Sequence, residues 1–142
     1  MRDAVGGSFM IKLLLVFLAV YTIFIAIAIN YAKAFRVKNK VLNIIEQNEG
    51  IKNYDDVTDP ALTQIEEYMN SIHYGVSTTT VENKCEDYNY INKDRGYCIA
   101  TVDDVDASYY KVTTFVTISI PVVRLEYTVP IRGETRKIEK VE

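Results

Sequence analysis

Hydrophobic residues are unevenly distributed along this chain, and the longest unbroken run lies near its N-terminus. Residues 13–32 carry no charge, and Lys12 and Lys33 stand at the two ends of the run. In an α-helix, a run of this length rises about 30 Å, which matches the hydrocarbon core of a bilayer. Lysines at its ends can extend their charges to the lipid headgroups. We therefore predict a single transmembrane helix over residues 13–32, preceded by a short cytosolic leader, residues 1–12.

The pattern changes after this run, because polar residues begin to alternate with apolar ones at helical spacing. Residues 33–49 are predicted to extend the helix, and Gly50 is a suitable stop signal. Lys38 lies off the apolar stripe of this extension and is expected to be solvated. The stripe would anchor a folded domain on the helix and offers a packing surface for neighbouring copies. Its members recur at spacings of three and four and are Val37, Val41, Ile44 and Ile45.

Residues 50–142 are predicted to form a small extracellular α+β head with an antiparallel sheet. Asp59 followed by Pro60 is typical of a helix start, because the carboxylate can accept from the first free N–H groups and proline fits the first turn. A short amphipathic helix ending near Gly75 is expected from this point. The fold class is therefore α+β, with one long N-terminal helix that carries a small β-rich head.

Strands are predicted where apolar and polar residues alternate or where β-branched residues gather. The clearest alternation lies on either side of Pro121. At this proline the apolar residues change from even-numbered to odd-numbered positions, and a turn or bulge accounts for the change. Phe115 is an exception to the alternation before that proline. After it, the apolar set consists of Val123, Leu125, Tyr127, Val129 and Ile131. The predicted strands cover residues 76–81, 97–102, 110–120 and 123–131.

An apolar run near an N-terminus can also be a cleaved secretory signal. Small residues at 26–28 and 32–34 resemble the pattern that precedes a cleavage site. However, the apolar region of a signal peptide is usually about 7–15 residues long, which is shorter than this run. The sequence after the run also continues the helix instead of opening into a loop. Retention as a membrane anchor is therefore favoured over cleavage.

Two signals conflict over the orientation of the chain in the membrane. Lys33, Arg36, Lys38 and Lys40 follow the apolar run, and the positive-inside rule would place them in the cytosol. The pair of cysteines in the head indicates an oxidising compartment instead. Because the basic residues belong to a continuing helix, they need not form a cytosolic loop. We expect a single-pass protein of the cell membrane, with its C-terminal domain extracellular.

Cys85 and Cys98 are the two cysteines of the chain. An even pair in an exported domain usually forms a disulfide, which for a loop of this size is worth about 3 kcal/mol in the chain-entropy model. A zinc site takes four ligands, and these cysteines with His73 supply too few. In a cytosolic domain, free thiols would be expected instead. We predict a disulfide between Cys85 and Cys98, and no metal site.

Charge and composition narrow the classes of function. Residues 1–40 hold six Lys or Arg and one Asp or Glu, a net charge of about +5. Residues 41–142 hold ten Lys or Arg and eighteen Asp or Glu, a net charge of about −8. An acidic head repels phosphate, so nucleic acid is not an expected partner. One histidine and no nucleophile–base pair argue against an enzyme, and no cofactor or small-molecule substrate is indicated. The 11 tyrosines either form a contact surface or fill the core of a head without tryptophan.

The order of these segments resembles a pilin or pseudopilin: a short leader, an apolar helix, an amphipathic extension and a β-rich head. The chain is similar to the TadE-like minor pilins of Tad-type, type IV pilus-like systems in Gram-positive bacteria. The resemblance implies possible processing of the leader at Gly6, Gly7 and Ser8. The strings that carry it are residues 4–8, 30–39, 96–98, 109–115 and 133–136.

In such pilins the apolar helix lies in the membrane before assembly and in the core of a filament afterwards. Type IV pilins keep a glutamate at the fifth position of the mature chain, and cleavage after Gly7 would place Lys12 there. The main hypothesis is a structural, pilin-like subunit of a pilus or secretion apparatus, whose partners are the lipid bilayer and other pilin or assembly subunits. The alternative is a membrane-anchored sensor or ligand-binding ectodomain.

Overall fold

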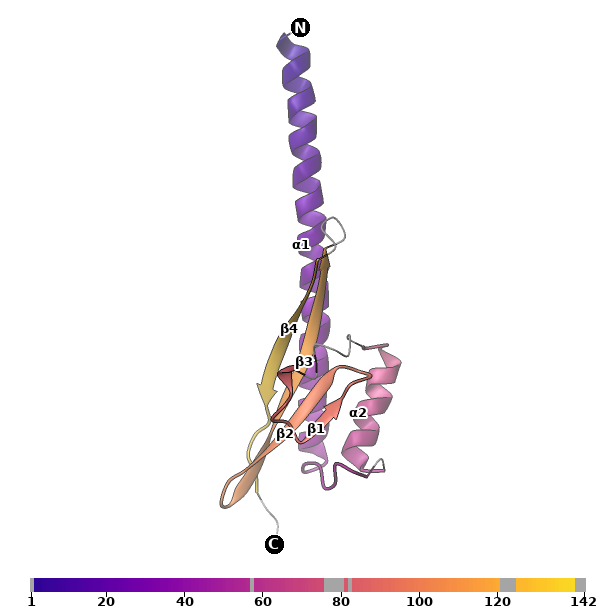
Figure 1. Cartoon of the computed structure of the whole chain (residues 1–142), viewed down its shortest axis with the longest axis vertical. Coiled ribbons are helices and arrows are strands. Elements are labelled where there is room, and N and C mark those ends of the chain that lie inside the picture. The colour runs from indigo at the N-terminus through magenta and orange to yellow at the C-terminus, as the bar shows by residue number, and fades with distance from the viewer. Residues whose placement is uncertain (1, 57, 76–80, 82, 121–124, 140–142) are drawn as a thin grey trace.

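The computed structural model describes every residue except 1, 57, 76–80, 82, 121–124 and 140–142. Helix α1 spans Arg2–Gln47 without interruption, so its backbone continues through the predicted boundaries at residues 12 and 32. Its second half lies against a sheet and a short helix, α2 (Pro60–Ser71), whereas its first half projects away from them (Figure 1). The predicted α+β fold, a long N-terminal helix carrying a small antiparallel head, is confirmed.

The sheet is antiparallel, and its central strand is long. Its main path follows the order β1-β2-β3-β4, and β5 pairs with the start of β3. Strand β3 pairs with β2 through residues 108–114 and with β4 through residues 111–120, so its last six residues continue beyond β2. The strands are β1 (Tyr90–Asn92), β2 (Tyr97–Asp103), β3 (Ala107–Ile120), β4 (Leu125–Glu134) and β5 (Ile138–Glu139).

Helix α2 begins where the sequence predicts, because Asp59 caps it. The Oδ1 atom of Asp59 accepts hydrogen bonds from the N–H groups of Ala61 at 2.9 Å and Leu62 at 3.4 Å. Its Oδ2 atom accepts from the N–H of Lys52 at 3.0 Å. One buried carboxylate therefore satisfies free donors of the helix and also fixes the loop that leads from α1 to α2.

The core of the head lies between the second half of α1, the sheet and α2. The predicted stripe on α1 is confirmed, since Val37, Val41 and Ile45 are fully buried and Ile44 is 3% exposed. The stripe belongs to one cluster with apolar residues of the other elements. That cluster includes Ile65 and Met69 of α2, Tyr97 and Ile99 of β2, and Tyr110 and Val112 of β3.

The end of α1 is fixed by a close contact between Gly50 and Tyr110. Gly50 has a φ of +98°, and its N–H donates to the carbonyl of Ile45 at 2.9 Å. The hydroxyl of Tyr110 accepts from the N–H of Ile51 at 3.1 Å. A Cβ atom on Gly50 would stand 2.9 Å from carbons of the Tyr110 ring. Both the positive φ and the close ring require glycine, which confirms the predicted stop.

The prediction that Lys38 is solvated is wrong. Lys38 is only 9% exposed, because β4 crosses α1 so closely that a Cβ on Gly133 would stand 2.8 Å from its Cδ atom. Its Nζ atom lies 4.2 Å from the centre of the Phe35 ring. The aliphatic part of the side chain is thus covered by the sheet, while its charge lies over an aromatic face.

Strands β1 and β5 were not predicted, and two of the predicted strands differ from the structure. Val81, the last residue of the predicted strand 76–81, has helical backbone conformation and is buried, while residues 76–80 lie outside the described part. The expected apolar face of β4 is only partly buried: Ile131 is 8% exposed, but Leu125 is 59% and Tyr127 is 68% exposed. The physical reason is that this end of β4 extends beyond β2 and α2 (Figure 1). Pro121 and Val123 lie outside the described residues.

We predict that Ile45→Asp lowers the free energy of unfolding of the head by roughly 4 kcal/mol, because it buries an unpaired carboxylate and leaves a cavity. Asn43→Asp is the matched control, since Asn43 is exposed on the same turn of α1. It should cost less than about 1 kcal/mol. Denaturant unfolding of the full chain in detergent, followed by near-UV tyrosine circular dichroism, measures both. Equal losses would show that the head does not dock through this stripe.

Candidate functional site

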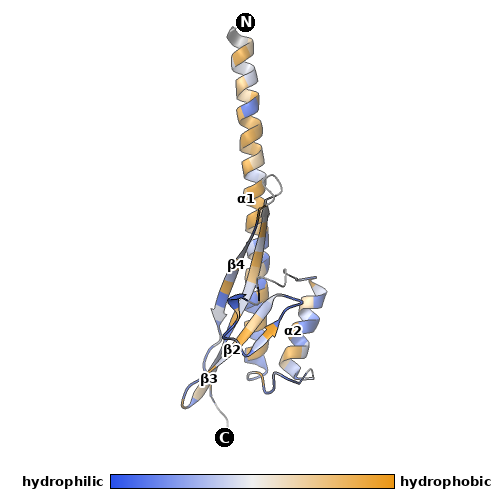
Figure 2. Cartoon of the chain, in the orientation of Figure 1, coloured by the Kyte–Doolittle hydropathy of each residue, from blue (hydrophilic) through white to orange (hydrophobic). Residues whose placement is uncertain are grey.

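The first half of α1 is an apolar surface that the rest of the described chain leaves almost entirely uncovered. Its exposed large apolar residues include Phe9 at 64% and Phe17 at 65% exposure. In Figure 2, most of this half of the helix has the colour of hydrophobic residues. Single soluble domains rarely expose a continuous apolar surface larger than a few hundred Å². By length and composition, α1 is able to cross a membrane. This surface is the candidate functional site, because it requires either lipid or other apolar helices around it.

The junction between this apolar segment and the head is marked by basic residues. Ala34 is the first buried residue of α1 among those whose burial is described, and Lys33 and Arg36 beside it are exposed. Lysine and arginine at the end of an apolar helix can contact lipid headgroups while their stems cover apolar surface. Beside these basic residues, a shallow cavity of about 360 Å³ lies between α1 and α2, lined in part by Ile29, Arg36 and Ile72.

The predicted leader lies at the opposite end of α1. Gly6, Gly7 and Ser8 are part of the helix and are exposed. A Cβ atom on either glycine would have nothing within 4 Å, so packing within the chain does not require glycine there. Lys12, which stands at the fifth position after Gly7, is exposed as well. Processing at this site stays a prediction.

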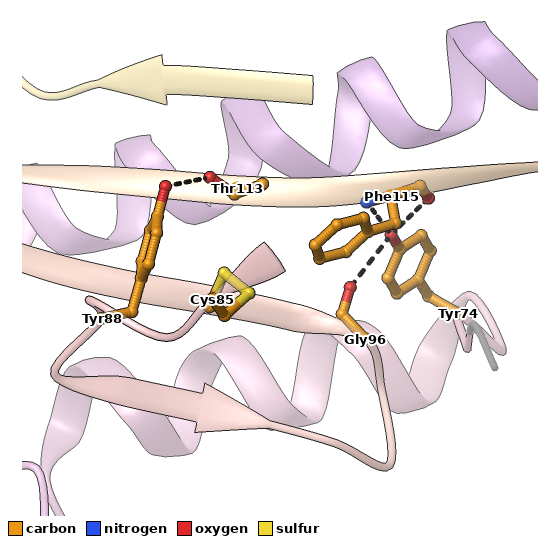
Figure 3. The surroundings of a disulfide bond; sticks show 7 residues. Tyr74, Cys85, Tyr88, Gly96, Thr113 and Phe115 are labelled. Carbon is orange, nitrogen blue, oxygen red and sulfur yellow. Dashed lines mark hydrogen bonds between the residues drawn. A yellow bond between two sulfur atoms is a disulfide. The ribbon is translucent and has the colours of Figure 1, made fainter. Parts of the chain in front are cut away.

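Cys85 and Cys98 are joined in a disulfide, as the sequence predicted, with an S–S distance of 2.10 Å. Both residues are fully buried on the face of the sheet opposite α1, together with Val81 and Phe115 (Figure 3). Cys98 lies in β2, opposite Ile91 of β1 and Thr113 of β3. The bond therefore ties the segment before β1 to the middle of the sheet. It also explains Phe115, whose side chain packs against the disulfide rather than against α1.

Tyr74 completes the hydrogen bonding of β3 at the point where β2 begins. Its hydroxyl donates to the carbonyl of Phe115 at 2.8 Å and accepts from the N–H of Phe115 at 3.0 Å (Figure 3). Both backbone groups of Phe115 therefore point away from β4, where Phe115 lies opposite Pro130 in a non-hydrogen-bonded pair. Burial raises the pKa of Tyr74 to about 12, although the bond to Phe115 lowers it, so the phenol stays neutral at physiological pH.

Several of the 11 tyrosines have structural contacts inside the head. Tyr97 and Tyr110 belong to the main core, and burial raises the pKa of Tyr97 above its ordinary range. Tyr88 shares a hydrogen bond of 2.7 Å with the hydroxyl of Thr113 beside the disulfide. These positions favour the core-filling interpretation for the buried tyrosines.

A groove of about 560 Å³ lies between α2 and β1. Tyr54, Leu62 and Tyr90 form its apolar part. At its polar end, Glu66 accepts from Nε of Arg95 at 3.2 Å and from Asn92 at 3.3 Å. Glu66, Asn92 and Arg95 therefore satisfy one another, whereas Glu67 is an exposed carboxylate that also lines the groove. Within the described chain, no three His, Cys, Asp or Glu residues come together as a metal site.

Comparisons of the chain with protein-family models, with curated proteins and with solved structures found no match. The resemblance to TadE-like pilins therefore depends on the residues and the architecture of this chain alone.

Proposed function

We propose that this chain is a membrane-anchored, pilin-like structural subunit of a Tad-type, type IV pilus-like or secretion apparatus. One observation carries the proposal: a single helix provides both the core of the head and a long apolar surface that the head leaves uncovered. A head fixed rigidly to an apolar helix is suited to assembly, because packing of the helices determines the spacing of the heads. The apolar half of α1 would exchange lipid for the helices of other subunits.

The proposed orientation places the head outside the cell. The buried disulfide supports it, since disulfides persist in oxidising compartments. Two of the four basic residues that argue for the opposite orientation also have contacts within the fold. Lys38 is covered by β4, and the Nζ atom of Lys40 lies 6.0 Å from the centre of the Tyr68 ring. They therefore need not be read as the positive residues of a cytosolic loop.

The second candidate function is a membrane-anchored ligand-binding ectodomain. The groove beside Tyr54, Leu62 and Tyr90 favours it, because its volume is that of a small-molecule site and its lining is largely apolar. The two functions differ in what surrounds the apolar half of α1. A subunit of an assembly has neighbouring copies on several sides, whereas an anchored receptor has lipid and at most one partner.

We predict that the double variant Leu14→Cys/Val16→Cys forms a ladder of cross-linked species larger than dimers when membranes are oxidised. Both positions are exposed, at 56% and 64%, and two residues apart on a helix point to nearly opposite sides. Each copy can then link to two neighbours. The native cysteines do not interfere, because they are paired and buried.

The single variants Leu14→Cys and Val16→Cys are the matched controls and should stop at dimers. Val105→Cys, which is 89% exposed at the far end of the head, controls for random collision. A double variant that gives only monomers and dimers would contradict the subunit and favour the receptor.

We predict that protease added to intact cells removes a C-terminal tag, because the head lies outside. Thiol-blocking mass spectrometry on the same cells should find Cys85 and Cys98 fully oxidised. A tag that stays protected until the cells are lysed would reverse the orientation. Free thiols on both cysteines would point to the same reversal.

A further inference from the structure

The hairpin formed by β3 and β4 projects beyond the rest of the head, alongside the apolar half of α1 (Figure 1). The hydroxyl of Thr114 donates to the carbonyl of Ala34 at 3.2 Å, which fixes the level of β3 on the helix. From Thr114, β3 continues to Ile120, a distance of roughly 20 Å. The same distance corresponds to roughly 13 residues of an α-helix. The hairpin therefore passes well into the level of the predicted transmembrane segment.

The burial of α1 agrees with this placement. Between Ala4 and Lys33, Ile23 and Ile27 are the only partly covered residues, and all others are exposed. They are four residues apart, so they lie on one side of the helix. Ile118 packs with Ala34 at the base of the same side, in a cluster with Val116 and Ile131. The hairpin thus covers one side of the last turns of the apolar segment and leaves the other sides open.

The projecting part of the hairpin has one apolar and one polar face. Ile118 lies directly opposite Tyr127, and residues that pair in this way point to the same face of a sheet. Leu125 shares that face, which is the face toward α1, yet it is 59% exposed and Tyr127 is 68% exposed. They are exposed because β4 lies beside the helix and not over it. The other face carries Thr117 and its partner Thr128.

This amphipathic hairpin does not fit a membrane that extends to Ala32. The outer strand, β4, is at the edge of the sheet, and an open edge is not stable in hydrocarbon, where backbone groups find no partners. Threonines on its second face would also be desolvated. In water, by contrast, Leu125 and Tyr127 would remain uncovered. The layer of lipid headgroups suits both faces, and tyrosine is typical of that layer.

A small shift of the bilayer along α1 removes the conflict. If the hydrocarbon covers residues 8–25 instead of 13–32, its thickness is about 27 Å, which is within the range of natural membranes. Lys12 then lies about one turn inside the inner boundary, a depth that its side chain can span to reach the headgroups. Asn30, which is exposed on α1, leaves the hydrocarbon.

We propose that the β3–β4 hairpin is a membrane-contacting element, with Tyr127 among the lipid headgroups on the side of the head and Leu125 at their boundary with the hydrocarbon, and that the hydrocarbon-embedded part of α1 ends near Ile25. The hairpin then fixes how deeply the helix sits and prevents the head from rotating freely about it. This inference depends on membrane anchoring by α1, which is part of the proposed function. It does not depend on assembly into a pilus.

The absence of tryptophan from the sequence allows a direct test. Three full-length variants, Tyr127→Trp, Phe17→Trp and Tyr109→Trp, each provide a single tryptophan, which can be excited selectively over the tyrosines. Phe17 lies in the apolar segment, and Tyr109 lies at the opposite end of β3 from the hairpin. Each variant is reconstituted in phosphatidylcholine–phosphatidylglycerol vesicles that carry a spin label either on the headgroup or at the middle of the acyl chain.

We expect the Tyr127→Trp variant to emit at shorter wavelength than Tyr109→Trp and to be quenched most strongly by the headgroup label. The Phe17→Trp variant should be quenched most strongly by the acyl-chain label, and Tyr109→Trp by neither. Stronger quenching of Tyr127→Trp by the acyl-chain label would overturn the proposal, since the hairpin would then lie in hydrocarbon.

Two other results would also overturn it. Blue-shifted emission of Tyr127→Trp without quenching would mean that a second copy of the chain covers the hairpin. Emission like that of Tyr109→Trp would place the hairpin in water. In either case, quenching of Phe17→Trp by the acyl-chain label would show that anchoring by α1 still holds. An unquenched Phe17→Trp would overturn both the hairpin proposal and membrane anchoring.

Discussion

The fold depends on the contact between the second half of α1 and the sheet. The buried stripe of Val37, Val41, Ile44 and Ile45 supplies the α1 side of the core, against which the sheet and α2 pack. Burying four such side chains is worth several kcal/mol, at about 2 kcal/mol each, which is similar to the whole stability of a small domain. The helix is therefore part of the head and not a tether to it.

This contact has a mechanical consequence, because a continuous helix transmits the position of the head to the apolar segment. The stop at Gly50 and the cover of Lys38 by β4 fix the helix against the sheet at two separate levels. On the other face, the disulfide ties the segment before β1 to β2, and Tyr74 of the main core bonds to β3 where β2 begins. A rigid unit of this kind can be placed in an array by packing of its helices, or held at a membrane surface by its hairpin.

The long helix, its stripe, α2 and the central strands could be predicted because each has a clear periodicity or a capping residue such as Asp59. Strands β1 and β5 have three and two residues, too few for a periodic signal. The burial of Lys38 depends on the close approach of Gly133, which is far away in sequence. The sequence pattern of β3 did indicate one feature: Phe115 is the apolar residue on its otherwise polar face, and this is the face that packs on the disulfide.

The candidate site was predictable only in part, because an apolar run does not show that a hairpin from the other end of the chain passes alongside it. Only the register of β4 against β3 places Leu125 and Tyr127 beyond the head.

The dependence of the head on α1 is tested most directly by two truncated chains, one that begins at Lys33 and one that begins at Gly50. The chain from Lys33 keeps the stripe and should give a water-soluble domain with an oxidised Cys85–Cys98 bond and a cooperative unfolding transition. The chain from Gly50 lacks the helical side of the core and should show neither native near-UV circular dichroism nor cooperative unfolding. If the chain from Gly50 folded as stably as the longer one, α1 would be only a tether, and the stripe would not be what holds the head together.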